Sequence, residues 1–254
     1  MVKLLTLLVA LLIASPSFAV VDPVGRWTFD EGTGTTAADS GSGGNNGTLL
    51  GSAGWGAGNV GAFALSTNGT TGNVVDVGDP GSGNLDFGTG SFSFSLWFKT
   101  SDTTNTKLLL TKRFSGSCIS GDEGYYFIMD SGGQFFTSVC DGTTGFTTST
   151  AWTGKSDNAW HHAVVIIDRG ANLLKLYGDN VLIGSNTDIT GLGSLSNTRS
   201  LIIGGSNFNE QVFNGLIDDV RIYNRVLTVG EIGDMFNQTE GTVTKRTIGP
   251  IVVW

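Results

Sequence analysis

The sequence predicts an all-β fold, an antiparallel two-sheet β-sandwich with one short helix near the C-terminus. Short apolar segments alternate with clusters of Gly, Asn, Asp and Ser; Gly occurs 39 times among 254 residues, and charged residues make up only 14% of the chain. This composition is typical of extracellular sandwiches with many tight turns. We find no long amphipathic helix and no strand–helix–strand rhythm, which disfavours a parallel sheet. Hydrophobic residues, at 39%, are sufficient to fill a core.

The first 19 residues have the three-part layout of a secretory signal peptide. Lys3 supplies a positive charge, residues 4–13 are apolar, and Ser17 and Ala19 are the small residues of a cleavage site. The apolar run is too short to cross a bilayer of about 30 Å as a helix, although an N-terminal membrane anchor is the alternative. We therefore predict a secreted or cell-surface protein whose mature chain has no transmembrane segment.

The charge balance bears on possible partners. The chain has 14 basic and 22 acidic residues, a net charge of −8, and loss of Lys3 with the signal makes the mature chain still more negative. A negative surface repels phosphate backbones and anionic lipids. We therefore expect no nucleic-acid partner.

The chain has two cysteines, Cys118 and Cys140. An exported protein with an even number of cysteines usually pairs them. The closed loop of about 20 residues would make the disulfide worth about 3 kcal/mol in the chain-entropy description. Two free buried thiols are the alternative.

Hydrophobic periodicity locates the strands. Residues 92–98 alternate with period two, which places Phe92, Phe94, Leu96 and Phe98 on one face, whereas residues 163–167 are continuously apolar, as in a strand buried on both faces. Residues 173–177 and 181–183 flank a Gly-Asp-Asn hairpin signal. Further strands are expected at residues 24–29, 61–65, 73–77, 107–111, 125–129, 135–139, 201–203 and 215–223.

One helix is expected after the last strand. Thr228 and Glu231 have the spacing of a capping box, with Thr at the N-cap, and a turn or two could run to about Phe236. We assign residues 20–238 to one domain and residues 239–254 to a C-terminal tail. The apolar end of the tail could add as a strand to a sheet edge and so assemble two molecules; a loosely ordered terminus is the alternative.

Five segments, in the same order, resemble those of the laminin G-like, concanavalin A-like jelly-roll family, and of pentraxins more distantly. They are Gly-Arg-Trp-Thr-Phe-Asp-Glu-Gly at residues 25–32, the Trp-containing strand at 91–99, Trp-His-His-Ala-Val at 160–164, Leu-Tyr-Gly-Asp-Asn-Val at 176–181, and Gly-Leu-Ile-Asp-Asp-Val-Arg-Ile-Tyr-Asn-Arg-Val-Leu at 215–227. The resemblance covers roughly residues 24–236. It implies a jelly-roll sandwich, whereas its functional implication is loose, because the family includes sugar binders, protein binders and structural appendages.

Asp218 is the most informative polar residue. Strict alternation would place it on an apolar face with Leu216, Val220 and Ile222, where an ionised carboxylate is costly unless it is paired or bound to metal. In the family, the N-terminal strand containing Asp30 and Glu31 lies near the C-terminal one. Together with the oxygen-rich loop at residues 39–46, these three carboxylates predict a structural Ca²⁺ site. The alternative is an Asp218 carboxylate that accepts backbone N–H groups without a metal. Asp219 and Arg221 are expected to form a surface ion pair.

Ligand-binding candidates lie in loops. Asn207, Asn209 and Glu210 could hydrogen-bond a sugar on which Phe208 stacks, in a loop placed like the pentraxin calcium loop. Trp55 and Trp152 also stand in loop-like contexts, where exposed aromatic rings can serve as sugar platforms. The alternative for each Trp is a loop anchor packed on the edge of the sandwich.

The sequence gives little support for catalysis. A glycosidase needs two carboxylates that flank the scissile bond, yet none of the five Glu residues occurs in the closely spaced patterns that this fold uses. His161 and His162, the two histidines, would point to opposite faces of a strand and cannot form a shared site. We therefore predict a secreted, non-catalytic module that binds carbohydrate, with an extracellular protein partner or a structural role as the alternative and a hydrolase or lyase as the least favoured reading.

Overall fold

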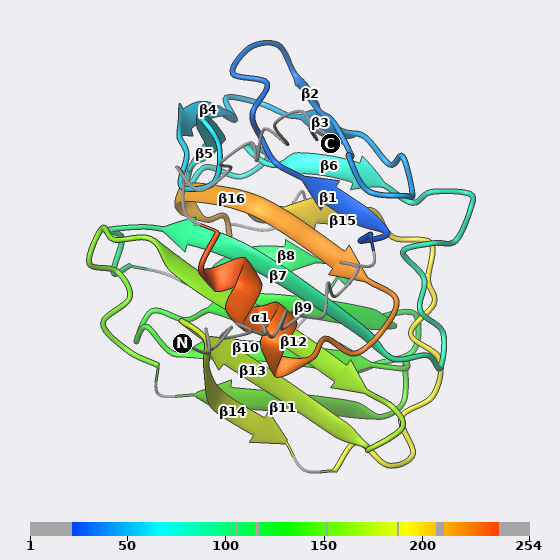
Figure 1. The fold of residues 1–254 in the computed structure, drawn as a ribbon. Coiled ribbons are helices and arrows are strands. Elements are labelled where there is room, and N and C mark those ends of the chain that lie inside the picture. The colour runs from blue at the N-terminus through cyan, green and yellow to red at the C-terminus, as the bar shows by residue number, and fades with distance from the viewer. Residues whose placement is uncertain are drawn as a thin grey trace, which may run out of the picture.

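The computed structural model describes residues 22–238, apart from residues 105, 115–116, 151, 187 and 207–210 and the side chains of residues 185–186. The predicted signal peptide at residues 1–19 and the predicted tail at residues 239–254 lie outside this part of the chain. The described residues form two layers of strands with one short helix against one of them (Figure 1). The elements are β1 (Gly25–Trp27), β2 (Thr36–Ala37), β3 (Gly47–Leu49), β4 (Gly54–Ala57), β5 (Phe63–Asn68), β6 (Val75–Gly78), β7 (Phe92–Lys99), β8 (Lys107–Thr111), β9 (Gly124–Met129), β10 (Phe135–Cys140), β11 (Gly145–Thr150), β12 (His161–Asp168), β13 (Leu173–Gly178), β14 (Val181–Asn186), β15 (Leu201–Ile203), β16 (Asn214–Tyr223) and α1 (Val229–Phe236).

The strands form two eight-stranded antiparallel sheets, which confirms the predicted sandwich. Sheet A has the order β14-β13-β12-β7-β16-β5-β4, with β1 added beside β16. Sheet B has the order β11-β10-β9-β8-β15-β6-β3-β2. Neighbours in each sheet are often distant in sequence, as a jelly roll requires, and the N-terminal β1 pairs with the C-terminal β16. The resemblance had implied this meeting of the two chain ends.

The core lies between the inner faces of the two sheets. The four apolar residues of β7 that alternate in the sequence, Phe92, Phe94, Leu96 and Phe98, all face it. The residues between them face the other way, towards α1, where the Ser95 hydroxyl contacts the Met235 sulfur at 3.5 Å. Strand β7 is therefore buried on both sides, although only one side belongs to the sandwich core.

Strand β12 shows the same double burial. Ala163, Val165 and Ile167 belong to the sandwich core, whereas Val164 and Ile166 pack in a second apolar cluster with the helix. This arrangement explains why the sequence of β12 is continuously apolar rather than alternating. The prediction of a strand buried on both faces is confirmed.

The predicted hairpin and helix both form. Asp179 and Asn180 connect β13 to β14 with φ angles of 47° and 64°, the left-handed pair that a tight two-residue hairpin turn needs. Helix α1 has the expected capping box: the Thr228 hydroxyl accepts from the backbone N–H of Glu231, whose carboxylate accepts from the backbone N–H of Thr228. The helix ends at Phe236, as predicted.

Four strands, β2, β3, β4 and β11, were not predicted. The first three are two to four residues long, and β11 reads Gly-Phe-Thr-Thr-Ser-Thr with a single apolar residue. Such segments carry no clear period of two, and they form strands because a neighbouring strand offers its backbone groups. Trp55, expected in a loop, consequently lies in β4, opposite Leu65 of β5.

Strand β16 departs from strict alternation. The pairing with β7 shifts register between Asp218 and Arg221, and Asp219 has a φ of 42°, which marks a β-bulge. Ile217, Val220 and Ile222 face the sandwich core as a result. The predicted shared face for Asp218 and Val220 is therefore wrong, because the bulge adds one residue between them.

Candidate functional site

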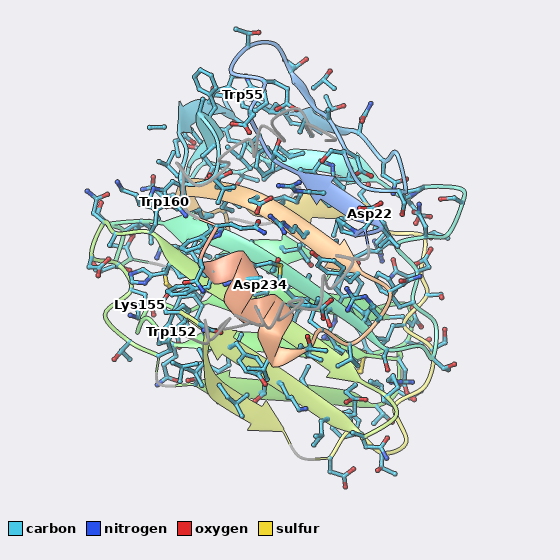
Figure 2. The ribbon with its side chains drawn as sticks, in the orientation of Figure 1. Asp22, Trp55, Trp152, Lys155, Trp160 and Asp234 are labelled. Atoms are coloured by element: carbon cyan, nitrogen blue, oxygen red, sulfur yellow. A yellow bond between two sulfur atoms is a disulfide. The ribbon has the colours of Figure 1, made fainter. Side chains whose placement is uncertain are left out.

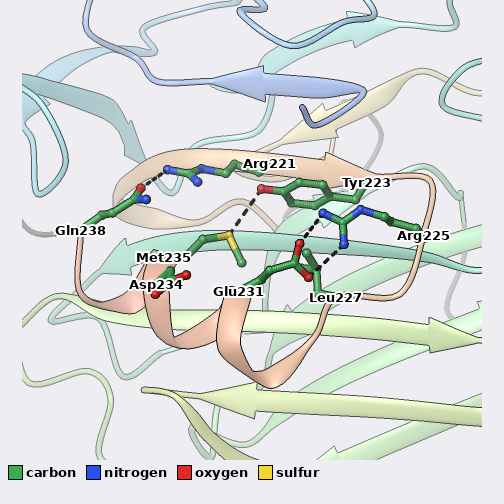
Figure 3. A pocket seen from close by; sticks show the side chains of 8 residues that line it. All are labelled: Arg221, Tyr223, Arg225, Leu227, Glu231, Asp234, Met235 and Gln238. Carbon is green, nitrogen blue, oxygen red and sulfur yellow. Dashed lines mark hydrogen bonds and ion pairs between the residues drawn. The ribbon is translucent and has the colours of Figure 1, made fainter. Parts of the chain in front are cut away.

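The outer face of sheet A is covered by α1. Ile232 and Met235 of the helix are buried against Val164, Ile166 and Tyr223 of the sheet. Polar contacts also hold the helix to the sheet (Figure 3). The Arg225 guanidinium forms an ion pair with Glu231 at 2.6 Å, and Arg221 donates to the Gln238 side chain at 2.7 Å. The hollow left beneath the helix has about 20 Å³, too little for a ligand. The contact between α1 and sheet A is therefore structural.

Asp218 lies on this outer side of sheet A, fully buried beneath a turn of the chain. Its Oδ2 atom accepts the backbone N–H groups of Asn59 at 2.7 Å and Val60 at 2.8 Å, and its Oδ1 atom accepts that of Asp219 at 2.7 Å. Burial raises the pKa of Asp218 to about 7, against the opposing effect of these backbone donors. The carboxyl group therefore has the backbone partners that we gave as the alternative to a metal.

The other two predicted calcium ligands also accept backbone N–H groups. Asp30 accepts from Ala62 at 2.7 Å and from Phe63 at 3.1 Å, and Glu31 accepts from Ala38 at 2.9 Å. Asp30 and Asp218 thus hold the two ends of the turn at residues 59–63, as the predicted proximity required. Among the described residues, no group of three His, Cys, Asp or Glu is placed to hold a metal ion. The Ca²⁺ site stays a prediction.

The Asp219–Arg221 pair is buried rather than on the surface, so that expectation is wrong. Arg221 donates to Asp219 at 2.6 Å, and Arg26 of β1 forms a second ion pair with the same carboxylate at 3.0 Å. Asp219 and Arg221 are 3% and 4% exposed. The bulge turns both side chains under the cover of α1 and β1, where each needs the other.

The two predicted tryptophan platforms are packed as anchors. Trp55 is half-buried against the core and donates its indole N–H to the Gly34 carbonyl at 3.1 Å. Trp152 lies with its ring 4.9 Å from the Phe135 ring and 5.8 Å from the Phe98 ring. Figure 2 shows the two tryptophans well apart, so they do not share a site.

His161 and His162 point to opposite sides of β12, as predicted. The His161 ring lies between the Asp157 and Asp179 carboxylates, at 3.1 and 2.9 Å. The His162 ring lies 4.9 Å from Trp97 on the helix side, and burial lowers its pKa to about 4. The two rings form no joint site.

The outer face of sheet B has no helix over it among residues 22–238 as described, and it carries two adjacent hollows of about 50 and 170 Å³. Both hollows share Thr111, Arg113 and Phe114, and we call them together the Arg113 groove. Their other lining residues are Leu108, Tyr126, Ile128, Thr198, Arg199, Ser200, Ile202, Ser206 and Gln211. The predicted ligand residues Asn207, Phe208, Asn209 and Glu210 lie outside the described residues, but Ser206 and Gln211, on either side of them, line this groove.

Arg113 is the central polar group of the groove. Its Nε atom pairs with the Asp122 carboxylate at 3.0 Å, and its Nη1 atom donates to the Ser138 hydroxyl at 3.1 Å. The guanidinium carbon lies 5.2 Å from the centroid of the Tyr126 ring. Only 6% of Arg113 is exposed, yet its Nη2 atom has no hydrogen-bond partner. The guanidinium group is thus held through its Nε and Nη1 atoms, while the N–H groups of its Nη2 atom have no acceptor.

Aromatic side chains and positive charge characterise the rest of the groove. Phe114 is 47% exposed, and the Arg199 guanidinium lies 5.0 Å from its ring centroid. Two arginines and no carboxylate occur among the described lining residues, on a chain whose net charge is −8. The groove is therefore a positively charged, aromatic hollow on a negative molecule.

Sequence reasoning missed the groove residues Arg113, Phe114 and Tyr126. One signal was available: Lys112-Arg113-Phe114 places two cations and an aromatic ring at the end of a predicted strand in a chain with few basic residues. Lys112 turned inwards to Asp79 and Asp86, at 2.8 and 2.9 Å, which leaves Arg113 for the outer face.

The disulfide Cys118–Cys140 is present, with an S–S distance of 2.02 Å, so the pairing prediction is confirmed. It connects the loop after β8 to the end of β10. In that loop, the backbone N–H of Phe114 donates to the Asp122 carboxylate at 2.8 Å. The disulfide thereby ties the loop that carries Phe114 to sheet B.

No helix within the described residues is long and apolar enough to cross a membrane.

Comparisons with known proteins agree with this fold. The chain is 25% identical over 158 residues to the adhesion G-protein coupled receptor V1 of Danio rerio, a match that covers 60% of this chain and 2% of that protein. The binding domain of Paraclostridial Mosquitocidal Protein 1 superposes with a TM-score of 0.68 at 17% identity, over 85% of this chain and 52% of that one. Thus this chain spans only a small part of the curated relative and about half of the toxin domain.

A third match has nearly the length of this chain's domain. Domain 4 of AbnA, an extracellular arabinanase from Geobacillus stearothermophilus solved in complex with arabinotriose, superposes with a TM-score of 0.61 at 20% identity, over 84% of this chain and 98% of that one. The laminin G family model described as the concanavalin A-like lectin/glucanases superfamily matches residues 68–233. The chain therefore belongs to the concanavalin A-like lectin/glucanases superfamily.

Proposed function

We propose that this chain is a secreted, non-catalytic module that binds glycans carrying an acidic group, in the Arg113 groove of sheet B. The observation that carries the proposal is the unpartnered Nη2 donor of Arg113 beside the Tyr126 ring. A buried N–H group without an acceptor costs about 1–3 kcal/mol, so an acceptor that reaches it is strongly favoured. Aromatic rings offer the apolar face on which a sugar ring packs.

The charge of the groove favours an acidic ligand. A carboxylate or sulfate group on a sugar would find two arginines in the groove, Arg113 and Arg199, against one carboxylate, Asp122, which is paired with Arg113 and is not a lining residue. The lack of carboxylates among the described lining residues also argues against hydrolysis there, because glycosidases use a pair of them. The superposed arabinanase domain, which was solved with arabinotriose, supports a sugar-binding role.

Secretion and calcium are parts of the same proposal. The signal-like residues 1–19 and the Cys118–Cys140 disulfide support export to an oxidising compartment. Calcium would bind through Asp30, Glu31 and Asp218, and it would have to compete with the backbone N–H groups that these carboxylates accept. Its role would be structural, since these residues lie on sheet A and not in the groove.

The proposal is tested by titration calorimetry with matched acidic and neutral probes: sialyllactose against lactose, and trigalacturonate against arabinotriose. We expect at least one acidic probe to bind more tightly than its neutral counterpart. Arg113→Lys keeps a positive charge but removes the planar fork, and we expect it to weaken binding about tenfold, the equivalent of one charge-assisted hydrogen bond. Arg199→Gln should weaken it less, because Arg199 is half-exposed.

Arg225→Gln is the matched control, since it alters an arginine ion pair on sheet A. It should leave glycan affinity unchanged. Equal affinity for acidic and neutral probes would contradict the acidic preference, and a failure of all four probes to bind would contradict the site. Repeating the titration and the thermal unfolding with calcium and with a chelator tests the metal: an unchanged melting temperature would eliminate it.

A further inference from the structure

A second, larger hollow of about 450 Å³ lies at the C-terminal end of α1, on the outer side of sheet A. We call it the Trp160 hollow. Its walls come from the turn before β5, from β7, from the start of β12, from the β13–β14 turn and from the end of the helix. The lining residues are Asn59, Trp97, Trp160, His161, Asp179, Phe236 and Asn237. The hollow shares no described residue with the Arg113 groove.

Two residues that line this hollow carry an N–H donor without an acceptor. The Trp97 indole Nε1 and the Asn59 side-chain Nδ2 atoms are both buried and unpartnered, and Trp97 as a whole is 4% exposed. Indole nitrogen can only donate. Each unmatched donor costs about 1–3 kcal/mol, which a ligand oxygen, or a water that the ligand holds, would recover.

Aromatic rings stand beside these donors. The Trp97 ring stacks on Phe236 with a centroid distance of 5.7 Å and an interplanar angle of 12°. Trp160 is half-buried and lies at the edge of the molecule, near the ends of β7 and β12 (Figure 2). A partly exposed indole ring that lines the same hollow as these donor residues suits a ligand with one apolar face and several hydroxyl groups.

The charges around the hollow favour an uncharged ligand. His161 and Lys155 balance Asp157 and Asp179, with nitrogen–oxygen distances to Asp179 of 2.9 and 3.3 Å. Hydrogen bonds to both carboxylates raise the pKa of His161, although burial acts against them. These balanced charges leave no excess of positive charge to hold an acidic ligand here, whereas the Arg113 groove has two arginines and one paired carboxylate, Asp122. A sugar hydroxyl group can instead donate to the Asp179 carboxylate and accept from the unpartnered N–H groups of Trp97 and Asn59.

We propose that the Trp160 hollow is a second ligand site, which takes one uncharged sugar residue with its apolar face against Trp160. This site is independent of the acidic-glycan groove, because it lies on the other sheet and uses other residues. The module would then hold two kinds of sugar on two sides.

The test follows tryptophan fluorescence and calorimetry of the full chain with the neutral probes lactose, cellobiose, maltose and arabinotriose. At least one should bind in the Kd range of single-site sugar contacts, tighter than about 10 mM. Trp160→Ala should weaken that binding about tenfold or more through loss of the stacking face. Trp97→Phe keeps a ring against Phe236 but removes the N–H group, and should weaken it about fivefold.

Three variants, each assayed with both kinds of probe, separate this proposal from the proposed function. Arg113→Lys should leave neutral-sugar binding unchanged, and Trp160→Ala should leave acidic-glycan binding unchanged. Trp55→Phe, a distant and half-buried tryptophan, should affect neither. Failure of every neutral probe to bind, or binding that Trp160→Ala does not weaken, would overturn the second site; neutral binding that Arg113→Lys abolishes would place it in the groove instead.

Discussion

The outer faces of the two sheets differ in what covers them. On sheet A, helix α1 covers the face, and Ile232 and Met235 fill the space between helix and sheet. On sheet B no described helix lies over Arg113 and Tyr126, and the face is hollowed. Both faces carry arginines over tyrosine rings, at 5.3 Å for Arg225 on Tyr223 and at 5.2 Å for Arg113 on Tyr126.

The difference lies in the partners of those arginines. Arg225 has a carboxylate of the covering helix, Glu231, at 2.6 Å, so its charge serves to hold the helix down. Arg113 is paired with Asp122, which belongs to a loop and not to a covering helix. Each arginine keeps one nitrogen without a partner, Nε in Arg225 and Nη2 in Arg113, but only Arg113 lines a hollow on a face that no described helix covers. An arginine over a tyrosine ring is therefore structural where a helix supplies the carboxylate that pairs with it. On the face without a described helix, we propose that it binds a ligand. The charge pattern alone does not distinguish these cases.

The largest expected effect comes from opening the covered face. Ile232→Ala removes a fully buried side chain of α1 and should cost about 2–5 kcal/mol of unfolding free energy through lost burial and a residual cavity. Phe114→Ala on the open face should cost about 1 kcal/mol or less, because the ring is half-exposed. Urea unfolding measures both. Equal losses at the two positions would contradict the distinction between the structural contact beneath α1 and the open face that carries the Arg113 groove.

The fold was predictable because several weak signals agreed on it. The period of two in β7, the hairpin turn at Asp179, the capping box at Thr228 and the order of the five family-like segments all indicate the same sandwich. Each of these depends on residues close together in the sequence. The jelly-roll order then follows from the resemblance, and it brought Asp30 and Asp218 to the same turn as expected.

The predictions that were wrong depend on contacts that the sequence does not display. The bulge at Asp219 changes which side of β16 faces the core, and apolar residues on both sides of the strand hide it from any count of alternation. At the groove, Arg113 contacts Tyr126 of β9 and Ser138 of β10, whereas Arg113 itself follows the end of β8. Only the register of those strands brings them together.

A smaller effect should appear in the pH dependence of the covered face. The pKa of Asp218 is raised to about 7 by burial, whereas an unfolded Asp titrates near 3.9. Between pH 4 and pH 7 the folded state holds a proton that the unfolded state has lost. The contribution of Asp218 to the free energy of unfolding is therefore fully present below about pH 4 and is lost as the pH rises through 7. The slope is at most about 1.4 kcal/mol per pH unit.

Asp218→Asn removes this titration and keeps one acceptor oxygen. The difference in unfolding free energy between the natural protein and this variant should therefore favour the natural protein more at pH 5 than at pH 7. Urea unfolding at several pH values measures it. A constant difference would show that Asp218 is ionised throughout, and a reversed slope in the presence of calcium would indicate that the ion binds the carboxylate.

The smallest effect concerns the way α1 is held at its start. The Thr228 hydroxyl accepts a hydrogen bond from the backbone N–H of Glu231 at 3.2 Å, and the Glu231 carboxylate accepts one from the backbone N–H of Thr228 at 2.8 Å. Thr228→Ala should cost about 1 kcal/mol, and Thr228→Ser should cost less because it keeps the hydroxyl. Hydrogen exchange should show the loss of protection in the helix, while acidic-glycan binding in the Arg113 groove stays unchanged. Weakened binding there would mean that the two outer faces are coupled through the core, and the covered face would then regulate the open one rather than only support it.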